Sequence, residues 1–151
     1  ALKLKFPRQI MLLRGNHEDR HVNKYLGFGE ECTKRLNEDI TDANSCFAKI
    51  NDAFDNLPLA AIVTDSNNVS SAAGGIGPTI TDIENIEKIQ RPFEITLGSD
   101  KVDNHQKVID LLWSDPHESE DITGFQHNFI RDPQKKNNMV NFGADNLNSF
   151  L

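Results

Sequence analysis

The chain has 151 residues, of which 37% are hydrophobic and 26% charged, and its formal net charge is -7 at pH 7. This length suits a single domain, and the negative charge argues against a nucleic-acid partner, because binding to a phosphate backbone needs clustered Lys and Arg. The cysteines, Cys32 and Cys46, lack a metal-binding spacing, and no secretory, membrane-spanning or lipidation signal is recognisable. We therefore expect an intracellular protein, cytoplasmic or nuclear or both, with no membrane partner.

The N-terminal third of the chain predicts a short strand followed by two helical pieces. Pro7 ends a first short segment, and residues 10–13 form a continuous apolar run that is typical of a buried strand. Apolar residues recur at helical spacing over residues 17–36, but a Gly-Phe-Gly sequence interrupts them, which predicts a break between two helices. Residues 37–45 are polar and predict a loop.

The middle of the chain predicts a helix, a hairpin and a second helix. Residues 45–57 place their apolar side chains on one stripe before a proline stops the helix. Two apolar runs, 59–63 and 69–73, flank a cluster of turn-forming residues and predict a β-hairpin. Residues 81–84 have the form of a capping box and predict the start of another helix.

The C-terminal third combines irregular stretches with apolar segments. Residues 93–104 are charged and irregular, whereas residues 108–112 are mainly apolar and lead into a Trp-Ser-Asp-Pro sequence. Residues 117–138 predict a long polar loop, and loops of that length are usually functional or disordered. A last helical segment is predicted over 143–151. Because strands and helices mix without regular alternation, the predicted fold class is a layered α/β arrangement.

The residues with the clearest chemical meaning lie at 14–18, where the predicted buried strand runs into a helix. Ligands usually meet an α/β sheet at such a strand end. Gly15 lets the backbone turn sharply, Asn16 offers a neutral oxygen that suits a hard cation, and His17 can donate a proton near neutral pH. Without further information, an Asn-His pair at a strand end is more often a turn residue beside a surface histidine.

The sequence Arg14-Gly15-Asn16-His17-Glu18 resembles the R-G-N-H-E motif of the phosphoprotein phosphatase family, metal-dependent enzymes that dephosphorylate phosphoserine and phosphothreonine. Further matches follow in the family's order and roughly its spacing, and they are Tyr25-x-Gly27-Phe28, Leu57-Pro58-Leu59-Ala60-Ala61, Gly74-Gly75-Ile76-Gly77-Pro78, Ile86-x-x-Ile89-x-Arg91-Pro92, Leu111-Leu112-Trp113-Ser114-Asp115-Pro116 and Phe142-Gly143. Chance does not produce such a series. The resemblance covers essentially the whole chain and is strongest to the branch whose catalytic domain follows Kelch repeats, known from plants and apicomplexan parasites.

The resemblance implies a fold, a reaction and partners. Residues 1–151 should be the central part of a single calcineurin-like metallophosphoesterase catalytic domain, truncated at both ends, whose fold is a β-sandwich flanked by helices. In the family, two divalent metal ions, manganese or iron with zinc, activate a water molecule for in-line attack on phosphorus. The implied partners are phosphoprotein substrates and a Kelch-repeat region in the parent chain.

The same resemblance implies roles for individual residues. Asn16 would bind one metal and orient the phosphate, and His17 would protonate the leaving oxygen of the serine or threonine. Arg131 resembles the phosphate-binding arginine of an N-x-R-G segment, although here the spacing is one residue longer and no glycine follows. The residues expected to support the site or to form its rim are Arg14, Glu18, Trp113 and Asp115.

The sequence also departs from the family pattern. The D-x-H, G-D-x-x-D-R-G and R-A-H motifs, which supply most metal ligands, are not present in these 151 residues. Ala73 stands where the family has the ligand histidine of an H-G-G sequence, and a methyl group cannot coordinate a metal. We therefore expect this chain alone to bind no metal stably and to be inactive.

Three hypotheses remain open from the sequence. The first is a fragment of an active Ser/Thr phosphatase, the second a pseudophosphatase or binding module that keeps the fold without the metal site, and the third a purely structural fragment. Ala73 and the missing motifs favour the second and third for this polypeptide. The intact Asn16-His17 pair favours an active parent enzyme, because a scaffold does not need it.

Overall fold

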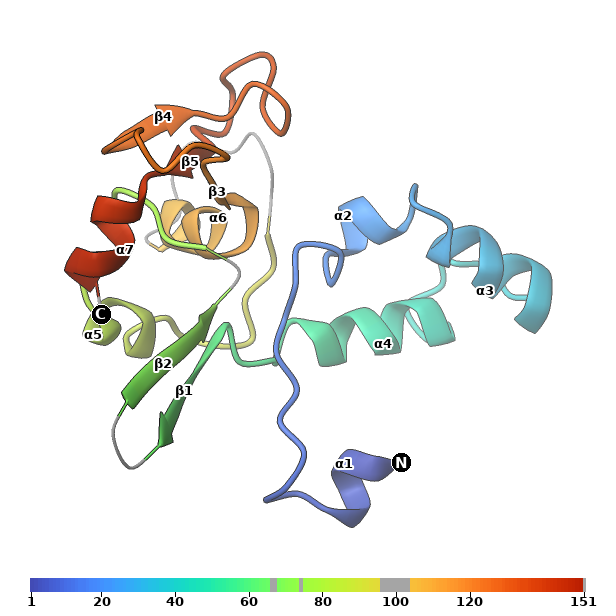
Figure 1. Ribbon diagram of the computed structural model, residues 1–151. Coiled ribbons are helices and arrows are strands. Elements are labelled where there is room, and N and C mark those ends of the chain that lie inside the picture. Colours follow the sequence, from blue (N-terminus) through green and yellow to red (C-terminus); the bar gives the residue numbers. More distant parts are fainter. Residues whose placement is uncertain (66–67, 74, 96–103, 151) are drawn as a thin grey trace.

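The computed structural model describes residues 1–65, 68–73, 75–95 and 104–150 (Figure 1). A mixed body of strands and helices holds the hydrophobic core, three helices extend from one side of it, and an N-terminal segment projects separately. No helix within the described ranges has the length and apolarity needed to cross a bilayer. Gly74 and most of the stretch 93–104, both used in the sequence analysis, lie outside these ranges.

The N-terminal segment differs from its prediction. Helix α1 (Leu2–Lys5) is followed by an extended stretch, and the predicted buried strand at 10–13 is wrong. Met11 and Leu12 are 64% and 46% exposed. A strand needs a neighbour for its backbone hydrogen bonds, but no described strand runs beside this stretch. It joins the mixed body through the Arg14 backbone N–H, which donates to the Pro58 carbonyl at 2.9 Å.

The next three helices largely follow the prediction. The expected break is confirmed: α2 (Arg20–Asn23) and α3 (Phe28–Leu36) are separated at Gly27, whose φ of 102° favours glycine. Helix α4 (Cys46–Phe54) begins at Ser45, whose hydroxyl accepts from the Ala48 N–H at 3.1 Å. Helices α3 and α4 pack through Phe28 and Phe47, whose ring centroids are 5.6 Å apart.

The predicted hairpin is confirmed. Strands β1 (Ala60–Asp65) and β2 (Asn68–Ala73) pair antiparallel, and the register runs from Ala60 opposite Ala73 to Asp65 opposite Asn68. Helix α5 (Ile83–Glu87) follows, capped by Asp82 rather than by the first residue of the predicted capping box. The Asp82 Oδ1 accepts from the Asn85 N–H at 2.8 Å.

A second, three-stranded sheet lies in the C-terminal part. Its order is β3 (Asp115–Pro116), β5 (Val140–Phe142) and β4 (Phe125–His127), with β3 parallel and β4 antiparallel to the central β5. Strand β4 corrects the prediction of an uninterrupted loop over 117–138. It has 3 residues and is defined by its pairing with distant β5, so periodicity alone does not reveal it.

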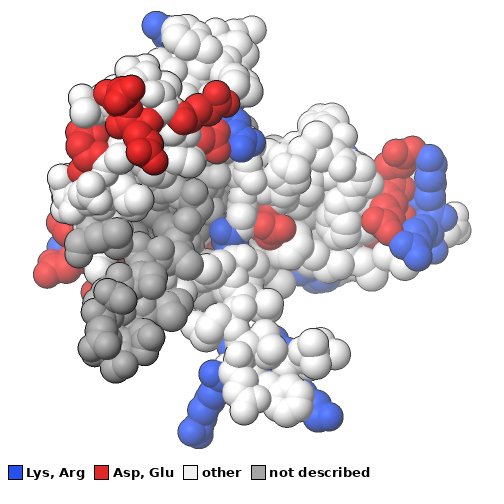
Figure 2. Space-filling view, in the orientation of Figure 1, with Lys and Arg blue, Asp and Glu red and all other residues white. Residues whose placement is uncertain are grey.

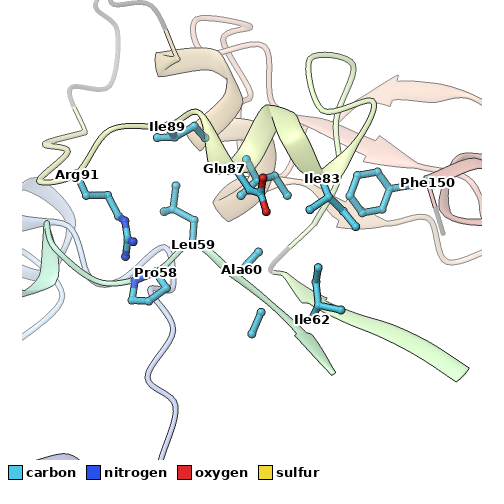
Figure 3. Close-up of a pocket in the computed structure, with 11 residues that line it drawn as sticks. Pro58, Leu59, Ala60, Ile62, Ile83, Glu87, Ile89, Arg91 and Phe150 are labelled. Atoms are coloured by element: carbon cyan, nitrogen blue, oxygen red, sulfur yellow. The ribbon is translucent and has the colours of Figure 1, made fainter. Parts of the chain in front are cut away.

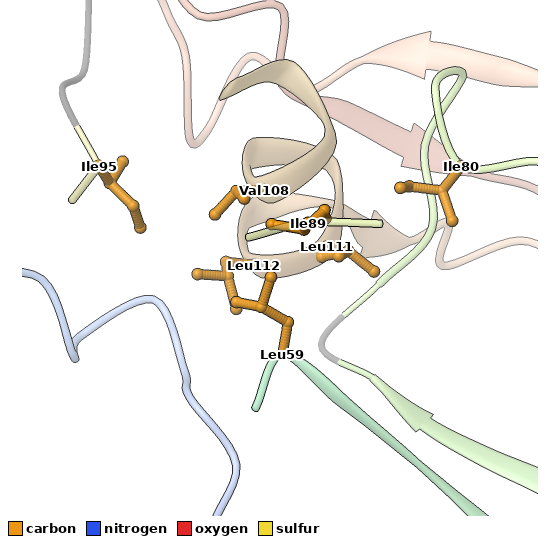
Figure 4. Packing of buried hydrophobic residues seen from close by; sticks show 7 residues of the cluster. All are labelled: Leu59, Ile80, Ile89, Ile95, Val108, Leu111 and Leu112. Carbon is orange, nitrogen blue, oxygen red and sulfur yellow. The ribbon is translucent and has the colours of Figure 1, made fainter. Parts of the chain in front are cut away.

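The core forms around helix α6 (His105–Trp113) (Figure 4). On this helix, Val108, Leu111 and Leu112 pack against the residue that precedes β1 and against residues of the α5 region. The remaining members of the cluster are Leu59, Ile80, Ile89 and Ile95. The last helix, α7 (Ala144–Phe150), confirms the helix predicted near the C-terminal end, and Phe150 packs against the core. The mixed α/β class predicted from the sequence is therefore confirmed.

Charged side chains of both signs lie over several parts of the face shown in Figure 2. Figure 2 shows acidic and basic groups side by side over the far end of α3, where Lys34 pairs with Glu30 and Arg35 with Glu31. Such exposed pairs one helical turn apart contribute only ~0.3–0.5 kcal/mol each. They keep this helix solvated without forming a recognition surface.

Candidate active site

Arg14 anchors the predicted catalytic turn to three other parts of the chain. Its side chain is 1% exposed, and Nη2 donates to the Asp55 carboxylate at 2.8 Å. Nη1 donates to the Phe93 carbonyl, and Nε donates to the Glu18 carbonyl at 2.9 Å. Burial lowers the pKa of Arg14, an effect that the neighbouring Asp55 carboxylate opposes. These hydrogen bonds therefore fix the residue at which the turn begins.

The turn itself is closed by Glu18. The Gly15 N–H donates to the Glu18 Oε2 at 2.7 Å, and the Glu18 N–H donates to the Gly15 carbonyl at 3.2 Å. A Cβ atom at Gly15 would lie 2.8 Å from the same Oε2. Between these residues Asn16 is half-buried and His17 exposed, and neither side chain hydrogen-bonds to another residue in the described part of the chain. The arrangement presents both side chains outward.

A carboxylate at the end of α4 binds the two arginines that flank this turn. Asp55 binds Arg14 through Oδ1 and Arg20 through Oδ2, each at 2.8 Å. Arg20 also reaches the more exposed Asp52 at 3.2 Å. The two arginines flank the turn in sequence, so one carboxylate fixes both of its ends. Sequence reasoning missed Asp55, because a single acidic residue at a helix end carries no sign that it faces a residue 41 positions away.

Arg131 and Asp115, both predicted for the site, meet in the second sheet. Arg131 Nε and Nη2 donate to the two Asp115 carboxylate oxygens at 2.9 and 3.1 Å, and Asn128 donates to the same carboxylate at 2.9 Å. The hydrogen bonds from Arg131 lower the pKa of Asp115, and the pKa of Arg131 is raised in turn. The guanidinium also lies over the Trp113 ring, 5.9 Å from its centroid.

A depression adjoins this ion pair. It measures about 660 Å³ and is lined by residues of β3, of the chain after it, of the 128–131 turn and of β5, among them Glu118 and Asn141. Asn16 and His17 do not line it. In the described ranges, no hydrogen bond or ion pair joins the Asn16-His17 turn to Arg131, so the structure leaves the predicted residues in two separate groups.

The predicted metal ligands are not assembled by the described residues. Within those residues there is no group of three or more His, Cys, Asp or Glu side chains that could hold a metal ion. Ala73 is the last residue of β2, with its backbone opposite Ala60, and its side chain lies outside the description. The residues present therefore do not fit a two-metal centre by themselves.

Comparison with known proteins decides the family. The sequence matches the calcineurin-like phosphoesterase family over residues 1–151. The chain belongs to this family. It is 37% identical over 150 residues to a protein of Arabidopsis thaliana, "Serine/threonine-protein phosphatase BSL2", and the match covers 99% of the chain and 13% of that relative.

A solved structure supports the same fold for this phosphoesterase chain. It is a "Protein serine/threonine phosphatase from Saccharomyces cerevisiae with similarity to human phosphatase PP5", matched with a TM-score of 0.66 and 26% identity. The match covers 99% of the chain and 40% of the yeast protein. The chain thus spans less than half the length of each of these two relatives.

An apolar pocket of this phosphoesterase chain lies away from the polar groups. It measures about 290 Å³ and is formed by the start of β1, helix α5 and Phe150 (Figure 3). Glu87 and Arg91 are its charged lining residues, and the others are Pro, Ala, Leu, Ile and Phe. This lining is mainly apolar and does not include Asn16, His17 or Arg131, so we do not assign the phosphoesterase chemistry to it.

Proposed function

We propose that this chain forms part of the catalytic domain of a Ser/Thr protein phosphatase, which hydrolyses phosphoserine and phosphothreonine esters. The observation that carries the proposal is the Asn16-His17 turn, held by the buried Arg14 and closed by Glu18 with both side chains directed to no described partner. The names of the two relatives support the same substrate class.

In this proposal His17 is the general acid. Water attacks phosphorus, the bond from phosphorus to the seryl or threonyl oxygen breaks, and His17 gives that oxygen its proton. The exposed position of His17 allows a protein substrate to reach it. Asn16 places its amide beside the phosphate. Phosphoproteins are the proposed substrates, and a Kelch-repeat region is the proposed neighbour in the longer protein.

Arg131 is the proposed phosphate-binding arginine. Its Nε and Nη2 atoms hold Asp115, whereas Nη1 donates to no residue in the described ranges. A phosphate oxygen can therefore bind Nη1 without breaking the ion pair. Asp115 keeps the guanidinium in place over Trp113 while it does so.

The metal ions are expected from the family and not from the residues of this chain. Of the predicted ligand set these residues supply Asn16, and Ala73 offers no donor atom. We assign no step of this chain to a metal. The same two facts favour the second candidate function, a pseudophosphatase or binding module that keeps the fold without turnover.

The two functions are separated by assaying the complete catalytic domain and the 151-residue chain on a phosphoserine peptide and on para-nitrophenyl phosphate. We expect the complete domain to turn over both substrates with Mn²⁺ and to stop after chelation, and the 151-residue chain alone to be inactive. A complete domain that binds the phosphopeptide without turnover would establish the binding module instead.

A further inference from the structure

Two buried titratable side chains outside the predicted site each keep one polar atom without a partner. Asp19 is 1% exposed and His105 is 7% exposed. Asp19 Oδ2 and His105 Nε2 have no hydrogen-bond partner among the described residues. Buried polar atoms are costly when unpaired, so nearly all of them find a partner in folded proteins. Arg20 Nε, Trp113 Nε1 and Ser114 Oγ also lack a hydrogen-bond partner among the described residues, but Asp19 and His105 are the two titratable groups of opposite charge type that act on one another.

Contacts through Phe93 place His105 beside the catalytic turn. The Phe93 carbonyl accepts a hydrogen bond from Arg14, the residue that begins the turn. The Phe93 ring lies 6.3 Å from the His105 ring, centroid to centroid. The Asp19 charge also raises the pKa of His105, against the larger lowering by burial, as expected for neighbours.

The other carboxylate oxygen of Asp19 already accepts hydrogen bonds directly after the turn. Oδ1 accepts from the His21 N–H at 2.7 Å and from the Val22 N–H at 3.3 Å, and it thereby caps α2 directly after Asn16 and His17. His105 is the first residue of α6, the central helix of the core. A water molecule shared by Oδ2 and Nε2 would connect the turn to the core helix.

We propose that Asp19 and His105 form a buried carboxylate–imidazole link, through one bridging water, that positions the Asn16-His17 turn against the start of α6. The link rests on the proposed phosphatase function. Asp19 and His105 are positioning residues in it, because they act through the turn and do not touch the substrate. One water suffices, since buried waters typically join otherwise unpaired polar groups.

The test uses Asp19→Ser, which keeps a hydroxyl to cap α2 but removes the oxygen facing His105. In the complete catalytic domain we expect kcat on a phosphoserine peptide to fall roughly 10- to 100-fold with little change in KM, because a displaced His17 protonates the leaving oxygen poorly. On para-nitrophenyl phosphate, whose leaving group needs no proton, the loss should be small. The matched control is Asp82→Ser at the exposed cap of α5, expected to behave like the wild type on both substrates.

His105→Phe is the partner variant, because it keeps the aromatic contact with Phe93 and removes Nε2. It should show the same substrate-selective loss of kcat. The kcat of the Asp19→Ser/His105→Phe double variant should be no more than about threefold below that of the less active single variant. Equal losses on both substrates, or single losses that multiply in the double variant, would overturn the link.

Thermal unfolding gives a readout that does not depend on activity. Each single variant should lower Tm by about 2–4 °C, and the double variant should be no lower than the less stable single one. Additive decreases would overturn the link even if the protein is a pseudophosphatase. A wild-type domain without turnover but with this coupling would instead refute the proposed function and keep the link.

Discussion

His17, the proposed general acid, is exposed, and its position makes it easy to replace without disturbing the fold. It has no side-chain hydrogen bond to a described residue, whereas its neighbours Gly15 and Glu18 hold the turn between them. Function and local structure are thus carried by different residues within one short sequence. Substitution can separate the two.

Replacing His17 by Asn should reduce kcat of the complete domain roughly 10²–10⁴-fold on a phosphoserine peptide, because a general acid is lost. The loss should shrink on an activated aryl phosphate, and thermal stability should be unchanged. His21→Asn, another exposed histidine four positions on, is the control and should retain activity. Equal losses on the two substrates would show that His17 does not supply the proton.

Ala73 offers a gain-of-function test at residue scale. Ala73→His in the complete domain should raise metal content, measured by elemental analysis, and should raise turnover, because the family places a ligand histidine there. Ala72→His, one position earlier on the same strand, is the control and should raise neither, because the resemblance aligns the ligand histidine with position 73. If Ala73→His changes neither metal content nor rate, the alignment of Ala73 with the ligand position is wrong.

At the scale of elements, the end of α4 matters most for the turn. Asp55 neutralises the buried Arg14 and also holds Arg20, and the helix end that carries it precedes β1 directly. A substitution at Asp55 therefore acts on the 14–18 turn from a distant part of the sequence.

Asp55→Ala should lower the free energy of unfolding by roughly 3–5 kcal/mol, because the buried Arg14 charge loses its partner. Asp52→Ala removes a carboxylate of the same helix that is 55% exposed and pairs only with surface cations, so it should cost less than about 1 kcal/mol. Urea unfolding of both variants measures the difference. Similar values for the two would mean that the Arg14–Asp55 pair contributes little.

The elements differ in whether nearby residues or distant ones determine their structure. The helix at 46–54 and the hairpin at 60–73 were predicted, because periodicity, capping residues and turn residues specify them within a short window. The strand at 10–13 and the loop containing β4 were mispredicted, because pairing with a distant strand decides whether such segments are strands. The family motif located the turn at 14–18. The carboxylate that holds it was missed, since nothing in the sequence joins Asp55 to Arg14.

At the scale of the whole molecule, apolar surface is left uncovered. Leu4 in α1 is 87% exposed, Met11 is 64% exposed, and the pocket beside β1 is lined mainly by apolar side chains. The described hairpin also pairs only β1 with β2, which leaves two strand edges without a described strand neighbour. Such surfaces favour association.

The 151-residue chain expressed alone should therefore self-associate or be partly molten. Sedimentation velocity over a range of concentrations should show species larger than the monomer, and the thermal transition should be broad. Met11→Lys together with Leu12→Glu, two exposed positions, should reduce the association without abolishing the helical signal. A sharp, concentration-independent transition from a wild-type monomer would contradict this.

The Arg14 side chain has a consequence for how the protein is made. One of its acceptors, the Phe93 carbonyl, lies 79 residues further along the chain. A ribosome adds roughly 5–20 residues per second, so about 4–16 s separate the synthesis of the arginine from that of its acceptor. During this interval the hydrogen bond from Arg14 to Phe93 cannot form, although Asp55 is synthesised earlier and can already pair with the guanidinium. A ribosome that pauses before the codon for Phe93 would leave the guanidinium without this acceptor.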